Sequence, residues 1–400
     1  MSCLACGNTQ LKTILDLGDQ PLANSYRCLT ADDHEDFFKL GINLCTSCFH
    51  LQQVEFVDPD LMYKNYLYVS GTSVTYRSYL KWFAKFTIEK VPSAKNVLDI
   101  GCNDGSQLNE FKELGLDTWG VDPAKNLAKI SSKNHIVHAD YFQNFNTELK
   151  FDIVTAMNVV GHQTDPLSFV KKCATLMHDQ SRLFIQTSQA NMVLNGEFDT
   201  IYHEHISFFN SQSMKILAER AGLVMIEVTK TDAHGESYVF TLAKSGDPDF
   251  SYISKERELG LFNPDMYRYW VERIQKFREL FPTIVSGKRL IGYGAAAKGN
   301  TLLNFTKVKP EVIIDDNPLK QGLCTPGMGV PIVSIGYLKA LPQEPVTFLP
   351  LSWNFFDEIK SKIKEHRPTI DDEFIHLSHI LSSIQASPPC LRASDVDFCE

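Results

Sequence analysis

The sequence predicts an α/β protein with a doubly wound, mostly parallel sheet at its centre, a small cysteine-rich lobe before it and a second, Rossmann-like αβ unit after it. Three observations support this prediction. Two Cys-x-x-Cys pairs open the chain, with 38 residues between them. Short apolar runs then alternate with helical stretches over residues 95–244, and a second strand–glycine–helix unit begins at about residue 288.

The bulk composition favours a soluble protein of two to three domains, with 400 residues, of which 44% are hydrophobic and 22% charged. The net charge of −9 disfavours nucleic acid as a partner, because proteins that neutralise phosphates are normally basic. No apolar run reaches the roughly 20 residues needed to span a bilayer, and the start of the chain lacks a signal-peptide core. Ten cysteines without an export signal predict reduced thiols. We expect a cytoplasmic monomer without a membrane partner.

The two cysteine pairs have the spacing of a zinc site. Cys3, Cys6, Cys45 and Cys48 can supply four thiolates to a tetrahedral Zn²⁺ and leave no open position for water. The ion would therefore be structural. Residues 1–65 form a lobe, short of helical periodicity and rich in turns, that cannot bury much surface alone, and the metal would supply the missing stability.

The rest of the chain divides by its periodicity. An amphipathic helix is predicted over 76–88, ahead of the alternating strands and helices of a central domain, residues 66–245. A charged helical stretch, 246–285, bridges to a C-terminal αβ domain, 286–380, and the last residues, 381–400, have no periodicity and resemble a loose tail. The predicted strands of the central domain are 95–100, 117–122, 151–157, 182–187, 223–229 and 237–244.

The turn LDIGCNDG, residues 98–105, has the composition of a cofactor-binding turn. Gly101 and Gly105 let the backbone approach a ligand at the carboxyl end of a strand, although the spacing is not the G-x-G-x-x-G of dinucleotide sites. Asp122 ends the next strand, where a carboxylate can accept hydrogen bonds from both hydroxyls of a ribose. Together these features suggest S-adenosylmethionine. An αβ turn with an acidic cap is the alternative reading of the same residues.

Further polar residues follow the predicted strands of this domain. Asp140 suits an adenine amino group, and a solvated loop aspartate explains it equally well. Asn158 and His162 close the strand at 151–157, where polar groups can face cofactor or substrate; a structural histidine is the alternative. Asn103 and Asp104, inside the glycine turn, complete the predicted cofactor residues.

The segment DTIYHEHISFF, residues 199–209, is the densest cluster of chemically active side chains. If it is extended, His203 and His205 share one face and Tyr202 and Glu204 the other; a tight turn would let all four converge. The spacing is not that of an H-E-x-x-H metal site. Acid–base chemistry is the better interpretation, because imidazole titrates near neutrality and a neighbouring carboxylate can orient it. A purely structural cluster remains open.

Three weaker motifs complete the set. YLYVSGTS, residues 66–73, contains Tyr66 and Tyr68 and alone would be an aromatic core strand. DAHGES places His234 beside a flexible glycine. GYGAAAKGN can present backbone amides, Lys298 and Asn300 to a phosphate at a helix N-terminus, although a plain αβ turn fits nearly as well.

These residues resemble the sugar C-methyltransferases of deoxysugar biosynthesis, which act on nucleotide-linked 4-keto sugars. The match runs from the N-terminal cysteines to about residue 380, and its most specific parts are YHEH and GYGAAAKGNT. The resemblance implies a class I methyltransferase fold, with a zinc-binding lobe and a C-terminal Rossmann-like domain that together enclose the substrate. Its landmarks are CLACG, LCTSC, YLYVSGTS, LDIGCNDG, MNVVGH, FDTIYHEHISFF, HGES, GYGAAAKGNTLLN, DDNPLKQG and PGMGVPI.

The resemblance also implies roles. His205 would remove the proton alpha to the ketone, at C-3 of the sugar, with Tyr202 and Glu204 assisting and Tyr66 or Tyr68 in the same site. A carbon nucleophile must be made as an enolate, so such a site needs a base, donors for the enolate oxygen and an aligned methyl group. The substrate-binding residues would be His162, His203, His234, Lys298 and Asn300, with Asn158 near the sulfonium.

The chain departs from the pattern of that family at a few positions. Cys102 and Asp122 stand where serine and glutamate are common, and both changes keep the chemistry. Glu236 stands where the family commonly has a second glycine, and an arginine of the same segment is missing. These last two changes leave the sugar and its nucleotide open.

Three other functions compete with carbon methylation. Methylation at oxygen or nitrogen on the same scaffold would need no enolate. A zinc-knuckle nucleic-acid-binding protein should carry a basic stripe, which an acidic chain disfavours. A nicotinamide oxidoreductase that uses GYGAAAKG is the least favoured, because the glycine fingerprint is incomplete.

Overall fold

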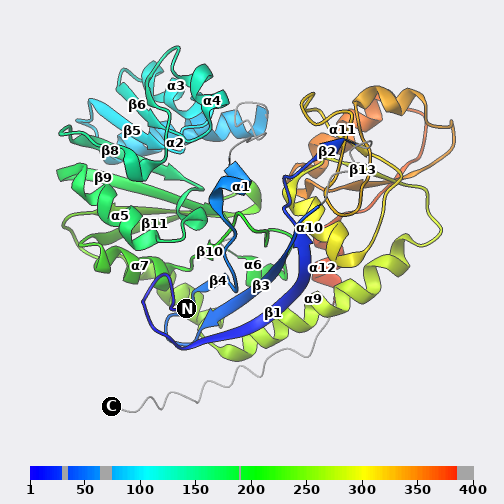
Figure 1. Ribbon diagram of the computed structural model, residues 1–400, viewed down its shortest axis with the longest axis horizontal. Coiled ribbons are helices and arrows are strands. Elements are labelled where there is room, and N and C mark those ends of the chain that lie inside the picture. Colours follow the sequence, from blue (N-terminus) through cyan, green and yellow to red (C-terminus); the bar gives the residue numbers. More distant parts are fainter. Residues whose placement is uncertain (29–34, 64–73, 189–190, 385–400) are drawn as a thin grey trace.

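The computed structural model describes residues 1–28, 35–63, 74–188 and 191–384. Two αβ lobes stand on a common base made by the long strands of the N-terminal lobe and one long helix (Figure 1). The central domain forms the left-hand lobe of this view and the C-terminal domain forms the right-hand one. The base therefore connects the two domains along their lower sides.

The N-terminal lobe is a four-stranded antiparallel sheet in the order β1-β3-β4-β10. The sequence predicted a turn-rich lobe without helical periodicity but no particular strands in it, and the structure adds the long strands β1 (Leu11–Pro21) and β3 (Phe37–Cys45). Register shifts in β1 break the alternation of apolar residues that would have revealed it. The fourth strand, β10 (Ser207–Phe208), belongs to the central domain and pairs with β4 (Leu51–Gln53).

The seven-stranded central sheet has the order β11-β12-β9-β8-β5-β6-β7, with five neighbouring strands parallel and β12 antiparallel to both of its neighbours. Each predicted strand is present, since buried parallel strands are short continuous apolar runs that sequence reveals well. The strands are β5 (Asn96–Ile100), β6 (Asp117–Val121), β7 (Ile136–His138), β8 (Phe151–Met157), β9 (Met177–Ser188), β11 (Val224–Thr231) and β12 (Ser237–Ala243).

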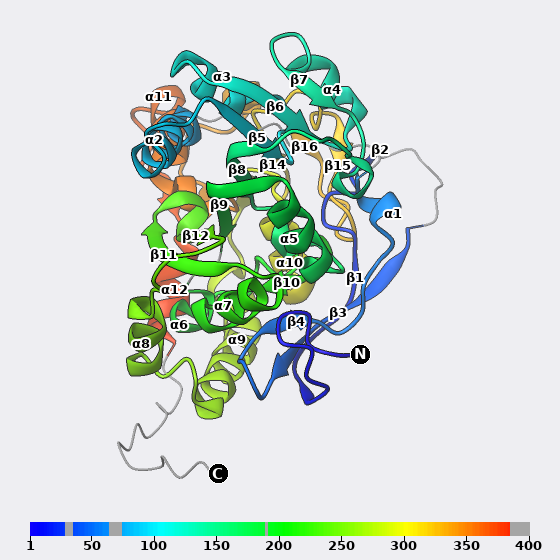
Figure 2. The same ribbon diagram turned by 90° about the vertical axis from the view of Figure 1, so that its left-hand side faces the viewer.

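Helices cover both faces of this sheet, as a doubly wound fold requires. Aromatic residues of α2 and α3 pack on one face, and α5 and α7 lie side by side on the other (Figure 2). The chain order reverses at β5, between β6 and β8, so the loops that follow these strands open a crevice at their carboxyl ends. The helices are α2 (Val74–Lys90), α3 (Ser106–Glu113), α4 (Lys125–Ser131), α5 (Pro166–Thr175), α6 (Met192–Asn195) and α7 (Ser211–Arg220).

The predicted bridging stretch contains two helices, α8 (Ser251–Glu258) and the long α9 (Pro264–Val285). The C-terminal domain that follows is a five-stranded parallel sheet in the order β16-β14-β13-β17-β18. Its main elements are β13 (Leu290–Tyr293), α10 (Ala297–Thr306), β14 (Ile313–Ile314), β16 (Ile332–Val333), β17 (Thr347–Pro350), α11 (Phe356–His366), β18 (Glu373–Phe374) and α12 (Leu377–Ser383).

The core of the base joins the domains into one packed unit. Leu15 and Ile42 from the N-terminal lobe, Trp270 from α9 and Phe305 from α10 belong to one cluster of buried side chains. A short pairing of β2 (Arg27–Cys28) with β15 (Leu323–Cys324) adds a second link between the first and last domains. Among the described residues, no helix combines the length and the apolar character that crossing a membrane requires.

Candidate functional site: a histidine–tyrosine pair beside the glycine turn

The segment of residues 200–206, here called the catalytic turn, lies between the central sheet and the N-terminal lobe. It is a tight turn, because the amide of His205 donates to the carbonyl of Tyr202 at 2.8 Å. This turn brings residues three apart together, so His205 meets Tyr202 and not His203. The sequence left an extended segment and a tight turn open, and the structure has the turn. In it Tyr202 meets His205, while His203 and Glu204 contact the N-terminal lobe.

His205 is nine-tenths buried and held at both ring nitrogens. Nδ1 lies 2.8 Å from the backbone carbonyl of Thr200, and Nε2 lies 2.8 Å from the hydroxyl of Tyr202. A carbonyl oxygen can only accept, so Nδ1 carries a proton in this arrangement and the neutral ring presents the lone pair of Nε2 to the phenol. The pair is thus arranged to move a proton at Nε2.

His162 completes an aromatic group around this pair. It ends the short turn η3 (Val160–His162), and its ring centroid lies 4.9 Å from that of His205 at an interplanar angle of 84°. Burial lowers the pKa of His162 to about 4, so the ring is neutral near pH 7. The amide of Ile206 donates to the carbonyl of Gly161 at 2.8 Å, which fixes η3 beside the catalytic turn. MNVVGH and YHEH therefore meet in space.

The other two residues of YHEH contact the N-terminal lobe. His203 is buried, and its Nε2 lies 3.2 Å from the carbonyl of Phe38 in the N-terminal lobe. Glu204 accepts a hydrogen bond from the Nδ2 of Asn24 at 2.6 Å, also in that lobe. Glu204 thus links the turn to the N-terminal lobe. The bonds described above that hold the ring of His205 come from Thr200 and Tyr202.

Gln53 on β4 is a site residue that the sequence did not reveal. Its Nε2 donates to the carbonyls of both Tyr202, at 2.6 Å, and His205, at 2.8 Å, and the residue is 1% exposed. The zinc-binding lobe thereby clamps both ends of the catalytic turn. A glutamine 152 residues away from its partner leaves no local signal, and only the strand pairing of β4 with β10 brings it there.

The glycine turn after β5 is shaped for close approach of a ligand. Gly101 and Gly105 have φ of 76° and 83°, and a Cβ at these positions would lie 2.5 Å from Val159 and 2.9 Å from Ser131. Asp122, 6% exposed, accepts from the backbone amides of Asn103 and Ala124, each at 2.8 Å. Each of its oxygens keeps a further lone pair for a ribose hydroxyl, so the turn fits the nucleoside of S-adenosylmethionine.

The remaining predicted cofactor residues stand around the same crevice. The carboxylate of Asp104 accepts from the amide of Ser106, the first residue of α3, at 3.1 Å. Asp140 follows β7 and is tied to the amide of Tyr141 at 2.7 Å and to Asn144 at 3.0 Å, contacts that lower the pKa of its carboxyl. The spacing had not distinguished an adenine contact from a solvated aspartate, and these local bonds account for the present position of Asp140.

Asn158 follows β8 with φ of 56°, a conformation that asparagine tolerates. The Nε2 of Gln186, on the adjacent strand β9, lies 3.5 Å from its Oδ1, and the hydroxyl of Tyr79 donates to the Oε1 of Gln186 at 2.6 Å. Gln186 is fully buried, so this polar chain is enclosed. Gln186 and Tyr79 are further residues of the crevice that no motif had indicated.

The four predicted ligands of zinc converge. Sulfur atoms of Cys3 and Cys48 are 3.6 Å apart, as are those of Cys6 and Cys45, and all four lie within 4.8 Å of one another. Four thiolates at the usual Zn–S distance of about 2.3 Å are about 3.8 Å apart in a tetrahedron, so the cluster fits a zinc ion with no open position. The N-terminal lobe is therefore a zinc-binding domain, and its ion would lie at one end of the lobe's sheet. Strand β4 of the same sheet contacts the catalytic turn through Gln53.

The weaker motifs fall at the C-terminal side. Lys298 Nζ lies 5.0 Å from the ring centroid of Trp353, and the Nδ2 of Asn300 donates to the carbonyl of Ala23 at 2.7 Å. Asn300 is 1% exposed, so this end of α10 is covered by the N-terminal lobe. His234 lies in the turn η4 (Ala233–Gly235), and its side chain is outside the description. Tyr66 and Tyr68 also lie outside the described residues.

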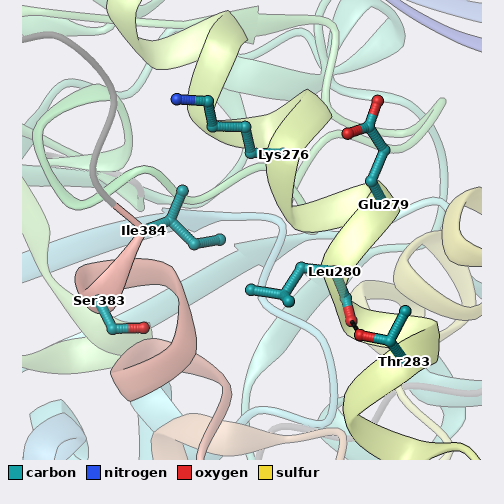
Figure 3. Close-up of a pocket in the computed structure, with 6 residues that line it drawn as sticks. All are labelled: Lys276, Glu279, Leu280, Thr283, Ser383 and Ile384. Carbon is teal, nitrogen blue, oxygen red and sulfur yellow. Dashed lines mark hydrogen bonds between the residues drawn. The ribbon is translucent and has the colours of Figure 1, made fainter.

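A surface hollow between α9 and the end of α12 is a separate feature (Figure 3). Its aliphatic, hydroxyl and charged side chains offer no histidine, and the hydroxyl of Thr283 is already bonded to the carbonyl of Leu280 at 2.7 Å. The hollow therefore offers no histidine–tyrosine pair comparable with that of His205 and Tyr202. It is lined by Lys276, Glu279, Leu280, Thr283, Ser383 and Ile384.

Comparisons with known families assign the three domains in order. The family described as "Putative zinc binding domain" matches residues 3–63, "Methyltransferase domain" matches 75–228, and "C-methyltransferase C-terminal domain" matches 237–375. These matches agree with the zinc cluster, the glycine turn and the catalytic turn. The three matches together identify an S-adenosylmethionine-dependent C-methyltransferase with an N-terminal zinc-binding domain, and the predicted fold and cofactors are confirmed.

Particular relatives place it more closely. C-methyltransferase NovU of Streptomyces niveus is 28% identical over 391 residues, which are 91% of this chain and 92% of that protein. The ubiquinone biosynthesis O-methyltransferase of Coxiella burnetii is 26% identical over 180 residues, 40% of this chain and 76% of that protein. A solved structure, the 1,6-didemethyltoxoflavin-N1-methyltransferase of Burkholderia thailandensis, matches 43% of this chain and 80% of that one at 16% identity with a TM-score of 0.36. Only the first of these three extends over all the domains described here.

Proposed function

We propose that this C-methyltransferase removes the proton alpha to the ketone of a nucleotide-linked 4-keto sugar and methylates that carbon, at C-3. The observation that carries the proposal is the His205–Tyr202 pair, with Nδ1 fixed by the Thr200 carbonyl and Nε2 left to exchange a proton at 2.8 Å. Methylation at carbon needs such a base, because a C–H bond beside a ketone must lose its proton before the carbon can act as a nucleophile.

In the proposed reaction each residue of the site has a defined role in the transfer of the proton. The alpha proton passes to the His205–Tyr202 pair, and the electrons of the broken C–H bond form the enolate. His162, neutral and half-buried, can donate a hydrogen bond toward the enolate oxygen without needing a charge of its own. Bound S-adenosylmethionine supplies the electrophilic methyl group. Without the methyl donor, the same pair can return a proton to the enolate carbon, or a deuteron acquired from deuterated solvent.

Two further expectations belong to the proposal. The acidic balance of the chain supports a small-molecule substrate over nucleic acid, with Lys298, Asn300 and His234 on the C-terminal side of the substrate. Tyr66 or Tyr68, which lie outside the described residues, would act in the same reaction, as the resemblance implies. We also propose that the enzyme acts as a monomer in the cytoplasm, a compartment in which the free cysteines of the described residues would stay reduced.

The test separates proton removal from methyl transfer. The protein is mixed with a panel of nucleotide-linked 4-keto-6-deoxyhexoses in deuterated water without a methyl donor, and deuterium at the alpha carbon is followed by mass spectrometry. His205→Asn should lose exchange at least 100-fold, as expected for a general base. His178→Asn is the matched control, because His178 pairs with Asp152 at 2.7 Å at the opposite end of the sheet.

Addition of methyl-labelled S-adenosylmethionine then locates the new bond. The proposal requires label on carbon and parallel losses of exchange and methylation in His205→Asn. Label on oxygen or nitrogen, with exchange irrelevant to turnover, would support the alternative methylation on the same scaffold.

A further inference from the structure

Gln186 is a fully buried amide at the carboxyl end of β9. Two residues earlier on the same strand, Phe184 packs edge-on against Phe83 and Phe86 of α2. Alternate residues of a strand share a face, so the apolar row under α2 ends in this amide. Burying an amide is costly unless its two ends are hydrogen-bonded, and an apolar side chain of similar size would pack as well. The amide therefore indicates a role beyond packing.

The carbonyl end of Gln186 is held by Tyr79, whose hydroxyl donates to Oε1 at 2.6 Å. The ring of Tyr79 is itself fixed in a stack, with its centroid 5.8 Å from that of Tyr76 and 5.3 Å from that of Trp82. Burial raises the pKa of the Tyr79 hydroxyl, so the phenol keeps the proton that it donates. With Oε1 bonded to Tyr79, the N–H groups of Gln186 are directed the other way.

The N–H end of Gln186 meets Asn158, which follows β8. Its Nε2 lies 3.5 Å from the Oδ1 of Asn158, and the backbone amide of Asn158 donates to the carbonyl of Gln186 at 2.9 Å. One residue thus contacts both the backbone and the side chain of Asn158. Because Oδ1 faces Gln186, the Nδ2 of Asn158 faces the opposite way, and it donates to no protein acceptor among the described residues. Its two N–H groups are left for a ligand.

Asn158 stands between the glycine turn and the base. A Cβ on Gly101 of that turn would lie 2.5 Å from Val159, the next residue of the chain. Four residues after Asn158 comes His162, whose ring centroid lies 4.9 Å from that of His205. An amide N–H is electropositive, so in this place it suits an oxygen that gains negative charge and not the sulfonium of the methyl donor.

We propose that Gln186 is a positioning residue for carbon methylation: held by Tyr79, it turns the N–H groups of Asn158 toward the enolate oxygen. The inference rests on the proposed function and gives that oxygen a second donor beside His162. The oxygen carries more negative charge in the enolate than in the ketone, so donors that are already in place lower the barrier to proton removal. The alpha proton still passes to His205, and neither amide gains or loses one.

A double-mutant cycle tests the proposal, with deuterium exchange into the sugar measured without the methyl donor. Asn158→Gly removes the amide, and glycine accepts the φ of 56° at this position, so exchange should fall about 100-fold. Gln186→Met keeps size and burial; it should lower exchange at least tenfold alone and less than about twofold in the Asn158→Gly background. The dissociation constant of S-adenosylmethionine, by calorimetry, should stay within about twofold throughout. A merely structural role would give the same loss in both backgrounds.

Two further variants separate the ends of the Gln186 amide. Gln186→Glu keeps an acceptor for Tyr79 but presents an acceptor to Asn158 as well, so the amide of Asn158 would rotate and turn its carbonyl toward the enolate. Exchange should then fall further than in Gln186→Met. Tyr79→Phe removes one hydroxyl and keeps the stacked ring; exchange should fall about threefold to tenfold, the size expected of one hydrogen bond. This variant gives the same cycle with a smaller change to the core.

Gln20→Met is the matched control. Gln20 is also a buried glutamine on a strand, 3% exposed, and its Nε2 donates to the carbonyl of Leu17 in the same strand β1 at 3.1 Å. The variant makes the same substitution away from the crevice. It should lower the melting temperature and keep the wild-type rate of exchange.

Equal losses of exchange in the wild-type and Asn158→Gly backgrounds would overturn the inference. Unchanged exchange with weaker binding of S-adenosylmethionine would also overturn it, because the amide of Asn158 would then serve the methyl donor. Both results leave the proposed function standing, since the wild type still exchanges the alpha proton. A wild type that exchanges no deuterium and places the label on oxygen or nitrogen removes the proposed function, and the inference with it.

Discussion

Gln53→Ala is the sharpest perturbation that the site offers, because it changes no residue that meets the substrate. It removes two hydrogen bonds, to the carbonyls of Tyr202 and His205, from a side chain that is 1% exposed. Each neutral bond contributes about 1 kcal/mol net, and each carbonyl left buried without a donor costs about 1–3 kcal/mol. We expect the free energy of unfolding to fall by about 2–4 kcal/mol.

The loss of the two hydrogen bonds of Gln53 should also lower the rate of catalysis. If about 2 kcal/mol of the lost free energy had stabilised the catalytic turn, the fraction of molecules with His205 correctly placed falls about 30-fold in the variant. Deuterium exchange into the sugar and kcat for methyl transfer should then fall together, while the KM for S-adenosylmethionine changes little, because the glycine turn is untouched. The assay is steady-state methylation beside exchange without the methyl donor.

Gln52→Ala is the control on the next residue of β4. Gln52 is equally buried, but it accepts from the amide of Leu4 at 2.8 Å and donates to the carbonyl of Ser2, so it holds the cysteine loop. It should destabilise the protein and weaken zinc binding, with kcat retained once zinc is saturating. Equal losses of kcat in the two variants, or none in Gln53→Ala, would refute the claim that β4 positions the base.

Three further outcomes are expected. Removal of zinc with a chelator should lower the melting temperature and abolish methylation, and both should return with Zn²⁺, as followed by calorimetry and label transfer. Asp122→Ala should weaken S-adenosylmethionine binding about 10–100-fold by calorimetry, since it removes the ribose acceptors and leaves the amides of Asn103 and Ala124 without a partner. Burial raises the pKa of Glu256 from 4.5 to about 7, so the folded chain keeps a proton that the unfolded chain has lost between these pH values, and stability falls as pH rises through this window. Glu256→Gln should reduce that fall by up to about 3 kcal/mol, measured by urea unfolding at pH 5 and pH 8.

The parts that the sequence predicted are those whose signal is local. The strands of the central sheet appear as apolar runs, and the glycines at 101 and 105 stand beside their strand because positive φ demands them there. The zinc site was predicted from the spacing of the four cysteines alone. In contrast, β1 and β3 were missed, because register shifts and exposed polar residues hide a long antiparallel pair.

The catalytic turn shows the other limit. The YHEH motif predicted acid–base chemistry but left its geometry open between an extended segment and a tight turn. The structure has the turn, in which Tyr202 contacts His205 and His203 contacts Phe38. Gln53 and Gln186 left no pattern at all, because each acts through a contact made by strand pairing. Chemistry can be read from residue types, whereas partners that are distant along the chain depend on topology.

Each domain contributes a separate restraint on the catalytic turn. Gln53 of the zinc-binding lobe donates to two of its carbonyls, and within the central domain Gly161 accepts from the amide of Ile206. Trp353 of the C-terminal domain donates to Asp199, the residue directly before the turn. The glycine turn that suits the cofactor, by contrast, is built wholly within the central domain, from β5, β6 and their loops. Binding of the methyl donor and the proposed removal of the sugar proton would therefore depend on different parts of the fold. If His205 is the base, it is positioned only in the assembled chain, and for this reason we expect removal of a zinc ion with no open position to abolish carbon methylation.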